Sequence, residues 1–178
     1  MKRMKKVSLM LLMMIGVTAF AQTEKEQELT KDAAEAKSEL IASYEKLVPF
    51  FDDSAGYVIF PNVGKGGLII GGASGNGIVY ENGVAIGKAG LKKLSVGLQA
   101  GGQAIMEVIF FEDEESLKNF KDGNFEFAAG VSAVVLKSGK AVNAKYKDGV
   151  AVFAKPKAGI MADASVGGQK FSYEAFED

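Results

Sequence analysis

The side chains available for chemistry in this chain are carboxylates, lysines, tyrosines and serines, because the sequence contains no cysteine and no histidine. These two absences exclude disulfides, Cys/His zinc sites, and serine or cysteine nucleophiles that histidine activates. We therefore expect a protein that binds something without catalysing a reaction, and we expect no cofactor. A hydrolase that uses two carboxylates is the least favoured alternative, because the chain has no tryptophan for a sugar platform.

Lysines are the first candidates for binding. Lys88, Lys92 and Lys93 follow the Asn82-Gly83 pair, and Lys65 stands in a glycine-rich segment. Lysines near hairpin tips interact with anionic lipid headgroups at about 1 kcal/mol each. The alternative is ordinary solubilising surface and protection of strand edges. The same two interpretations apply to the later lysines, which are Lys137, Lys140, Lys145, Lys147, Lys155 and Lys157.

Two other motifs have the composition of a ligand site. The acidic run at residues 112–115 offers carboxylates to a cation, but it lacks the spacing of an EF-hand and suits the start of a helix. The glycine run at residues 71–77 is not G-x-G-x-x-G and opens onto a strand, and Gly87-Lys88 lacks the rest of a P-loop. We therefore expect neither a metal site nor nucleotide binding.

The N-terminus has the three parts of a secretory signal peptide. A basic head with Lys2 and Arg3 precedes an apolar run over residues 7–17, and Ala19-Phe20-Ala21 forms a cleavage motif. The apolar run is too short to span a bilayer comfortably, so a retained anchor is the less favoured alternative. We expect cleavage near Ala21 and a secreted protein of the periplasm or cell envelope.

The part that follows the cleavage motif is mildly acidic. Residues 1–21 hold four of the 21 Lys and Arg and none of the 22 Asp and Glu, which leaves a net charge of −5 on residues 22–178. Nucleic acid is not an expected partner, because binding it needs clustered basic residues. The length is sufficient for one domain with its own core.

The first element after a polar leader at residues 22–29 is an amphipathic helix. It is expected to start at Thr30 and to end near Val48, because Pro49 follows, which leaves Phe50 and Phe51 in the exit segment. Its apolar stripe either packs on the core of the domain or inserts into a membrane surface. The stripe consists of Ala33, Ala36, Leu40, Tyr44, Leu47, Val48 and Phe51.

Short strands joined by tight turns are expected from Tyr57 onwards. The turn signals are Asn82-Gly83, Ser138-Gly139, Asp148-Gly149 and the segment 155–157, and Pro61-Asn62 is expected to end the first strand. A short helix is expected from residue 113 to residue 120. Thirteen of the 22 glycines fall between Gly64 and Gly102, among apolar residues, which indicates a bent sheet whose backbone packs closely against the helix or a ligand.

These elements predict an α+β domain, mainly antiparallel β, over residues 30–178. Its core is a glycine-rich bent meander, barrel-like or a sandwich, with an N-terminal amphipathic helix and one short internal helix. Three ordered motifs, at residues 57–67, 71–77 and 96–103, closely resemble the SYLF-domain family. The motif positions are Gly64, Gly66, Gly67, Gly72, Gly75, Gly77, Gly97, Gln99, Gly101 and Gln103.

The resemblance implies a lipid-binding module. Eukaryotic members of the family bind phosphoinositides, partly through the N-terminal amphipathic segment, and yeast members also bind actin. Bacterial relatives are exported or lipoprotein forms that are described as lipid-binding. Some eukaryotic members carry Arg where this chain has Ala73, and this sequence shows no SH3 or FYVE module. For a chain with this signal peptide, the resemblance implies an envelope phospholipid as the ligand.

The residues and the resemblance together predict a non-enzymatic module of the cell envelope that contacts phospholipid or a membrane surface. The alternative is an envelope protein-interaction or structural module, whose sheet receives a partner protein. The expected lipid contacts come from the helix and the hairpin lysines, and they are Leu47, Val48, Phe50, Phe51, Lys65, Lys88, Lys92 and Lys93.

Overall fold

The computed structural model describes residues 24–123, 134–136 and 145–177. An N-terminal helix covers residues 24–43 and is followed by η1 (Glu45–Leu47), α2 (Val48–Asp53), β1 (Gly56–Glu81), β2 (Val84–Phe111), α3 (Glu114–Lys121), β3 (Val134–Val135) and β4 (Val150–Ala175). Four expected features lie outside the described residues, namely the signal peptide, the Ser138-Gly139 turn, Lys137 and Lys140.

The N-terminal helix starts earlier than predicted and ends earlier. Thr30 does not cap it, because the Thr30 hydroxyl donates a hydrogen bond to the carbonyl oxygen of Glu26 within the helix, at 2.8 Å. The helix ends at residue 43, and η1 and α2 follow as separate short turns. Pro49 lies in the first turn of α2, where no backbone N–H donor is needed, so proline begins a helix here. Across the described ranges, no helix is both long and apolar enough to cross a membrane.

The apolar stripe of the N-terminal helix packs on one face of the sheet. Ala33, Ala36 and Leu40 are at most 3% exposed and contact a cluster that we call the helix-side core. Besides these helical residues, the helix-side core contains Tyr44, Leu47, Phe51, Tyr57, Ile59, Ile78, Tyr80, Met106, Val108, Phe110, Leu136, Ala151 and Phe153.

The strands are far longer than the short runs that the sequence predicts. Pro61-Asn62 does not end a strand, because a register shift between Phe60 and Val63 lets β1 continue past it. The expected turn at residues 155–157 is also wrong. Pro156 lies inside β4 at a second register shift, opposite Ile105. Proline is tolerated at such bulges because no ladder hydrogen bond needs its missing N–H group.

The expected tight turns and the short helix are confirmed where they are described. Asn82 and Gly83 both have positive φ, at 52° and 77°, and Asp148-Gly149 has the same geometry, at 53° and 74°. Asp113 caps α3 by accepting a hydrogen bond from the backbone N–H of Ser116 at 2.8 Å. The acidic run is thus a helix start, and no cluster of three or more His, Cys, Asp or Glu side chains occurs in the described residues.

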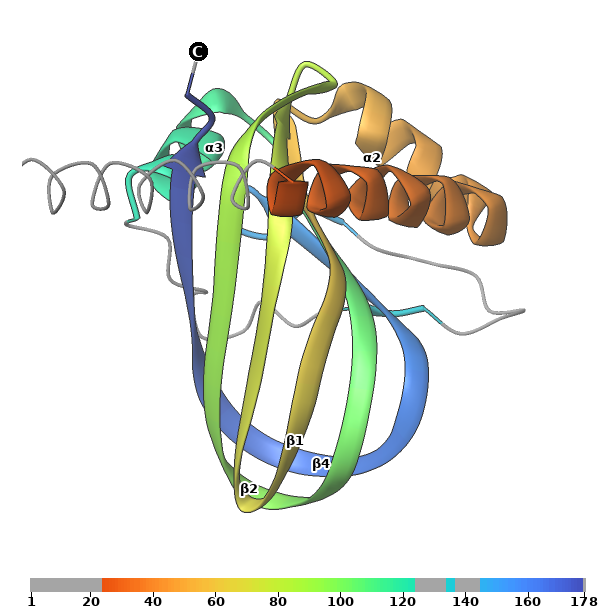
Figure 1. Ribbon diagram of the computed structural model, residues 1–178, viewed down its shortest axis with the longest axis vertical. Helices are drawn as coiled ribbons and strands as arrows, with labels where there is room; N and C mark the ends of the chain where they lie inside the picture. The colour runs from red at the N-terminus through yellow and green to blue at the C-terminus, as the bar shows by residue number, and fades with distance from the viewer. Residues whose placement is uncertain (1–23, 124–133, 137–144, 178) are drawn as a thin grey trace, which may run out of the picture.

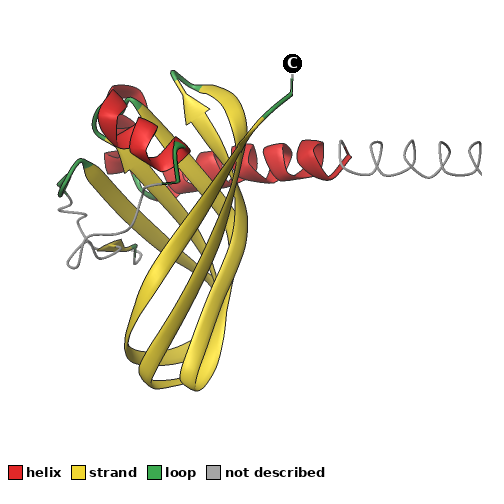
Figure 2. Cartoon of the chain, turned by 90° about the vertical axis from the view of Figure 1, so that its left-hand side faces the viewer, coloured by secondary structure: helices red, strands yellow, loops and turns green. Residues whose placement is uncertain are grey.

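Strand β1 turns back on itself, as Figures 1 and 2 show for the long strands as a group. A Cβ atom added at Gly77 would lie 2.6 Å from the carbonyl oxygen of Ile59, so the first and last thirds of β1 lie side by side. The rings of Tyr57 and Tyr80 stack across the same junction, at 4.9 Å. The expected bend is confirmed, and the glycine backbone packs against the other half of the sheet itself.

The sheet is open. Its strand order is β1-β2-β4-β3, with antiparallel pairs except the short parallel pair of β3 with β4. Among the described residues no ladder joins β1 to β3 or β4, so the barrel-like alternative is wrong. The α+β class with a mainly antiparallel sheet is confirmed. Helix α3 covers the inner face, where Phe120 contacts the rings of Phe111 and Phe171 at 5.0 and 5.6 Å.

Candidate functional site

Three of the four apolar residues predicted to contact lipid lie in the helix-side core or against it. Leu47 is fully buried and Phe51 is 7% exposed. Phe50 packs its ring against Phe110 and Phe153 at 5.4 and 5.0 Å, and Val48 is half-buried at the start of α2. In this structure these side chains stabilise the fold, so their contact with lipid stays a prediction.

The predicted lysines do not form one cluster. Successive residues of a strand point to opposite faces of the sheet, so Lys92 and Lys93 cannot share a surface. Lys88 and Lys92 lie on the outer face of β2, which points away from α3. Lys93 lies on the inner face with Leu91, which belongs to the apolar cluster around Leu117 and Phe120 of α3. Lys65 is on β1, opposite Gln103 of β2.

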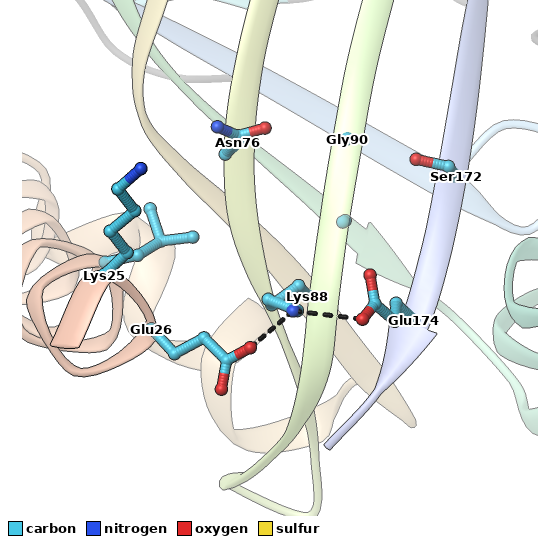
Figure 3. Close-up of a pocket in the computed structure, with 9 residues that line it drawn as sticks. Lys25, Glu26, Asn76, Lys88, Gly90, Ser172 and Glu174 are labelled. Carbon is cyan, nitrogen blue, oxygen red and sulfur yellow. Dashed lines mark hydrogen bonds and ion pairs between the residues drawn. The ribbon is translucent and has the colours of Figure 1, made fainter. Parts of the chain in front are cut away.

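Lys88 is the centre of an ion-pair junction between three elements (Figure 3). Its ammonium lies 2.5 Å from the Glu26 carboxylate of the N-terminal helix and 3.1 Å from that of Glu174 on β4. The hydrogen bond with Glu26 is the main reason that the pKa of Lys88 is raised. Two carboxylates therefore more than offset this one positive charge. The junction lies beside a pocket of about 330 Å³ that Asn76 and Ser172 also line.

Glu107 is a buried carboxylate that the sequence reasoning missed. It is 6% exposed, and burial raises the pKa of its carboxyl group. The side-chain amide of Gln169 donates a hydrogen bond to it at 2.9 Å. This hydrogen bond, and then the positive charges of Lys93 and Lys65, oppose the rise in pKa. The available signal was one acidic residue within an apolar run at residues 104–111.

Lys92 lies in a second pocket, of about 400 Å³, which adjoins the first on the outer face. Lys170 of β4 is its direct partner across the ladder, and both lysines are exposed. The polar side chains around them are Asn62, Ser74, Asn76 and Ser172, and no described residue that lines this pocket is acidic. Sequence reasoning missed Lys170 because the pairing of β4 with β2 is not a local property.

The bend of the sheet carries an exposed apolar surface, which we call the apolar bend and define as Leu68, Ile69, Ile70 and Leu94. Their side chains are 73%, 62%, 67% and 76% exposed. Ile69 adopts a φ of 66°, in the left-handed region that a β-branched residue rarely enters. Both Figure 1 and Figure 2 show the strands reaching this end of the molecule well beyond the described helices.

The motif glycines meet next to the apolar bend. Gly66 and Gly67 of β1 pair with Gly102 and Gly101 of β2. On β1, Gly75 approaches the backbone of residues 62 and 63, while Gly64 has open space around it. The other motif positions are spread along the same two strands and are Gly72, Gly77, Gly97, Gln99 and Gln103.

A known protein family matches the second half of the chain. Residues 92–175, from Lys92 in β2 to the end of β4, match the family described as "Ysc84: Las17-binding protein actin regulator". The chain contains a Ysc84 (SYLF) family domain. The Ysc84 match includes Lys92, Lys170, Glu107 and Gln169, whereas the β1 residues of the same two sites lie outside it.

A bacterial protein is also similar to the chain. "Beta cell expansion factor A" of Aeromonas veronii is 30% identical over 127 residues, which cover 68% of this chain and 46% of that protein. The chain thus spans about half the length of this relative. The Ysc84 domain assignment concerns the family, and the ligand has to be inferred from the surface of this chain.

Proposed function

We propose that this Ysc84 domain is a non-enzymatic module that binds phospholipid at a membrane surface, with the apolar bend as the part that enters the lipid. The exposed apolar bend is the observation that carries the proposal. Leu94 and Ile70 are large and exposed, and they lie two ladder positions apart, since Ile70 pairs with Val96. Contiguous exposed apolar side chains at one end of a domain mark a surface that is covered in use.

The backbone at Ile69 supports the same assignment. A non-glycine residue with φ near 66° costs free energy, and such strain persists where a function or the surrounding structure requires it. Here the left-handed residue is the middle one of three exposed apolar residues at the turn of β1. A glycine would relieve the strain but would remove an apolar side chain from the bend.

The spacing of apolar and basic residues on β2 suits the layers of a membrane. Leu94 and Lys92 point from the same face, two residues apart, which corresponds to roughly 7 Å along the strand. Each headgroup layer of a bilayer is about 5–8 Å thick. When Leu94 enters the apolar layer, Lys92 reaches the level of the headgroups.

The apolar bend is a better candidate for insertion than the predicted apolar contacts in η1 and α2. Leu47 and Phe51 would have to leave the helix-side core to contact lipid, and exposing a large apolar residue costs about 1.5–3 kcal/mol. The bend needs no such rearrangement. We further propose that the domain acts in the periplasm or cell envelope after removal of residues 1–21.

Co-sedimentation with vesicles over a salt series tests this proposal. The protein from Gln22 onwards keeps every described residue, and we expect it to pellet with phosphatidylglycerol vesicles at low and high salt, more weakly at high salt. Salt-resistant binding would come from the apolar bend, and the salt-sensitive part from lysines. Failure to pellet with either anionic or neutral phosphatidylcholine vesicles would reject the proposal in favour of a protein partner for the bend.

A further inference from the structure

The Lys92–Lys170 pair is an unbalanced positive site on the outer face of the sheet. The two residues are direct partners in the β2–β4 ladder, so their side chains leave the same face from Cα atoms about 5 Å apart. Like charges placed directly opposite each other destabilise a sheet. Within the described part of the chain, neither lysine has a carboxylate partner, whereas Lys88 on the same face has two.

We propose that Lys92 and Lys170, with Ser74, Asn76 and Ser172, form a binding site for a phosphate group. The two ammonium groups supply charge, and the two hydroxyls and the amide supply hydrogen-bond donors to phosphate oxygens. These side chains line one pocket, across three neighbouring strands. The absence of acidic residues from its described lining selects an anion over a cation.

Gly90 keeps this site open. It lies between Asn76 and Ser172 in the ladder, as Figure 3 shows, and it belongs to the lining of the pocket. A Cβ atom at position 90 would lie 2.6 Å from the Ser172 hydroxyl oxygen, so any larger residue would displace that hydroxyl. Glycine at this position therefore leaves the hydroxyl accessible to a ligand.

The source of the phosphate is either a lipid headgroup or a soluble phosphate ester. The lipid source rests on the proposed function, because insertion of Leu94 would bring Lys92 to the headgroup layer. The soluble source does not depend on it. A test in the absence of lipid therefore separates this site from the membrane proposal.

The test is thermal unfolding of the full chain with inorganic phosphate, with chloride at equal ionic strength as the reference. We expect phosphate to raise Tm by roughly 2–4 °C when it is several-fold above its Kd. Lys92→Gln and Lys170→Gln should each raise Tm without phosphate, because repulsion is relieved, and should lose most of the phosphate-dependent rise. The control is Lys145→Gln, which removes an exposed lysine outside the pocket and should behave as the unmodified chain.

A second arm identifies the source. Vesicles of phosphatidylcholine with phosphatidic acid present a lipid phosphomonoester, and each lysine removed should weaken binding to them roughly fivefold. If both lysine variants bind these vesicles more weakly, the site is assigned to headgroups. If they bind the vesicles as the unmodified chain does, but have lost the phosphate-dependent rise in Tm, the site is assigned to soluble phosphate esters. A phosphate-dependent rise in Tm that is absent, or equal in both variants and Lys145→Gln, would overturn the site.

Discussion

Gln169 of β4 donates a hydrogen bond of 2.9 Å from its side-chain amide to the buried carboxylate of Glu107 on β2. The ladder pairs Gln169 with Lys93, fourteen residues before Glu107 on the same strand, so this bond joins the two halves of the folded-back sheet. A polar link within a mainly apolar interior fixes how the halves meet, because a buried carboxyl group without a partner is costly.

Replacing Glu107 with Gln should change how stability depends on pH. Burial raises the pKa of Glu107 from its usual value of 4.5, so the native state binds this proton more tightly than the unfolded chain does. The contribution of Glu107 to the free energy of unfolding is thus fully present below about pH 4.5, and it is lost as pH rises through the native pKa. The hydrogen bond from Gln169 and the positive charges of Lys93 and Lys65 lower the pKa and so limit the loss.

Urea unfolding of the unmodified chain and of Glu107→Gln, measured from pH 4 to pH 8, checks this prediction. The free energy of unfolding of Glu107→Gln should increase relative to that of the unmodified chain as pH rises above 4.5. All other titrating groups are common to both proteins and cancel in the difference. A difference that stays constant with pH would show that Glu107 titrates normally in the folded state.

Replacing Gly77 with Ala should destabilise the fold by about 1–3 kcal/mol, through overpacking. The added Cβ atom would lie 2.6 Å from the Ile59 carbonyl oxygen and 2.7 Å from the Phe60 ring, where β1 packs against itself. Gly64→Ala is the matched control, since a Cβ atom there meets nothing within 4 Å. Equal unfolding free energies for the two variants would contradict the close approach within β1.

Replacing Lys88 with Met should loosen the start of the N-terminal helix. The Lys88 side chain is 20% exposed and holds Glu26 and Glu174 together, so we expect a loss of about 1 kcal/mol and faster amide exchange near Glu26. Lys118→Met breaks a far more exposed pair with Asp122 and should change little. Hydrogen exchange that stays unchanged at residues 24–30 would mean that the junction does not hold the helix.

Local signals in the sequence were sufficient for the turns and for α3. Asn82-Gly83 and Asp148-Gly149 have the positive φ that these dipeptides favour, and Asp113 caps its helix. The strand end predicted at Pro61 and the turn predicted around Pro156 were wrong, because a proline tolerated at a bulge has the same sequence signal as one that ends a strand.

The parts of the candidate site that depend on pairing between distant strands could not be predicted from the sequence. Alternation along β2 would already have separated Lys93 from Lys88 and Lys92, because it depends only on residue spacing. The partnership of Lys92 with Lys170 and the contact of Gln169 with Glu107 depend on register between strands that are far apart in the sequence. The exposure of Leu68 to Ile70 depends on where β1 turns back, which no local motif specifies.

The central claim is that the apolar bend enters the membrane, and the double variant Ile70→Ser/Leu94→Ser tests it most directly. Its match is Val84→Ser, because Val84 is 64% exposed next to the Asn82-Gly83 turn, at the other end of the strands. We expect the double variant to bind phosphatidylglycerol vesicles at least tenfold more weakly at high salt, since each side chain contributes about 1–2 kcal/mol. Val84→Ser should bind as the unmodified protein does. Equal binding by all three proteins would contradict insertion of the bend.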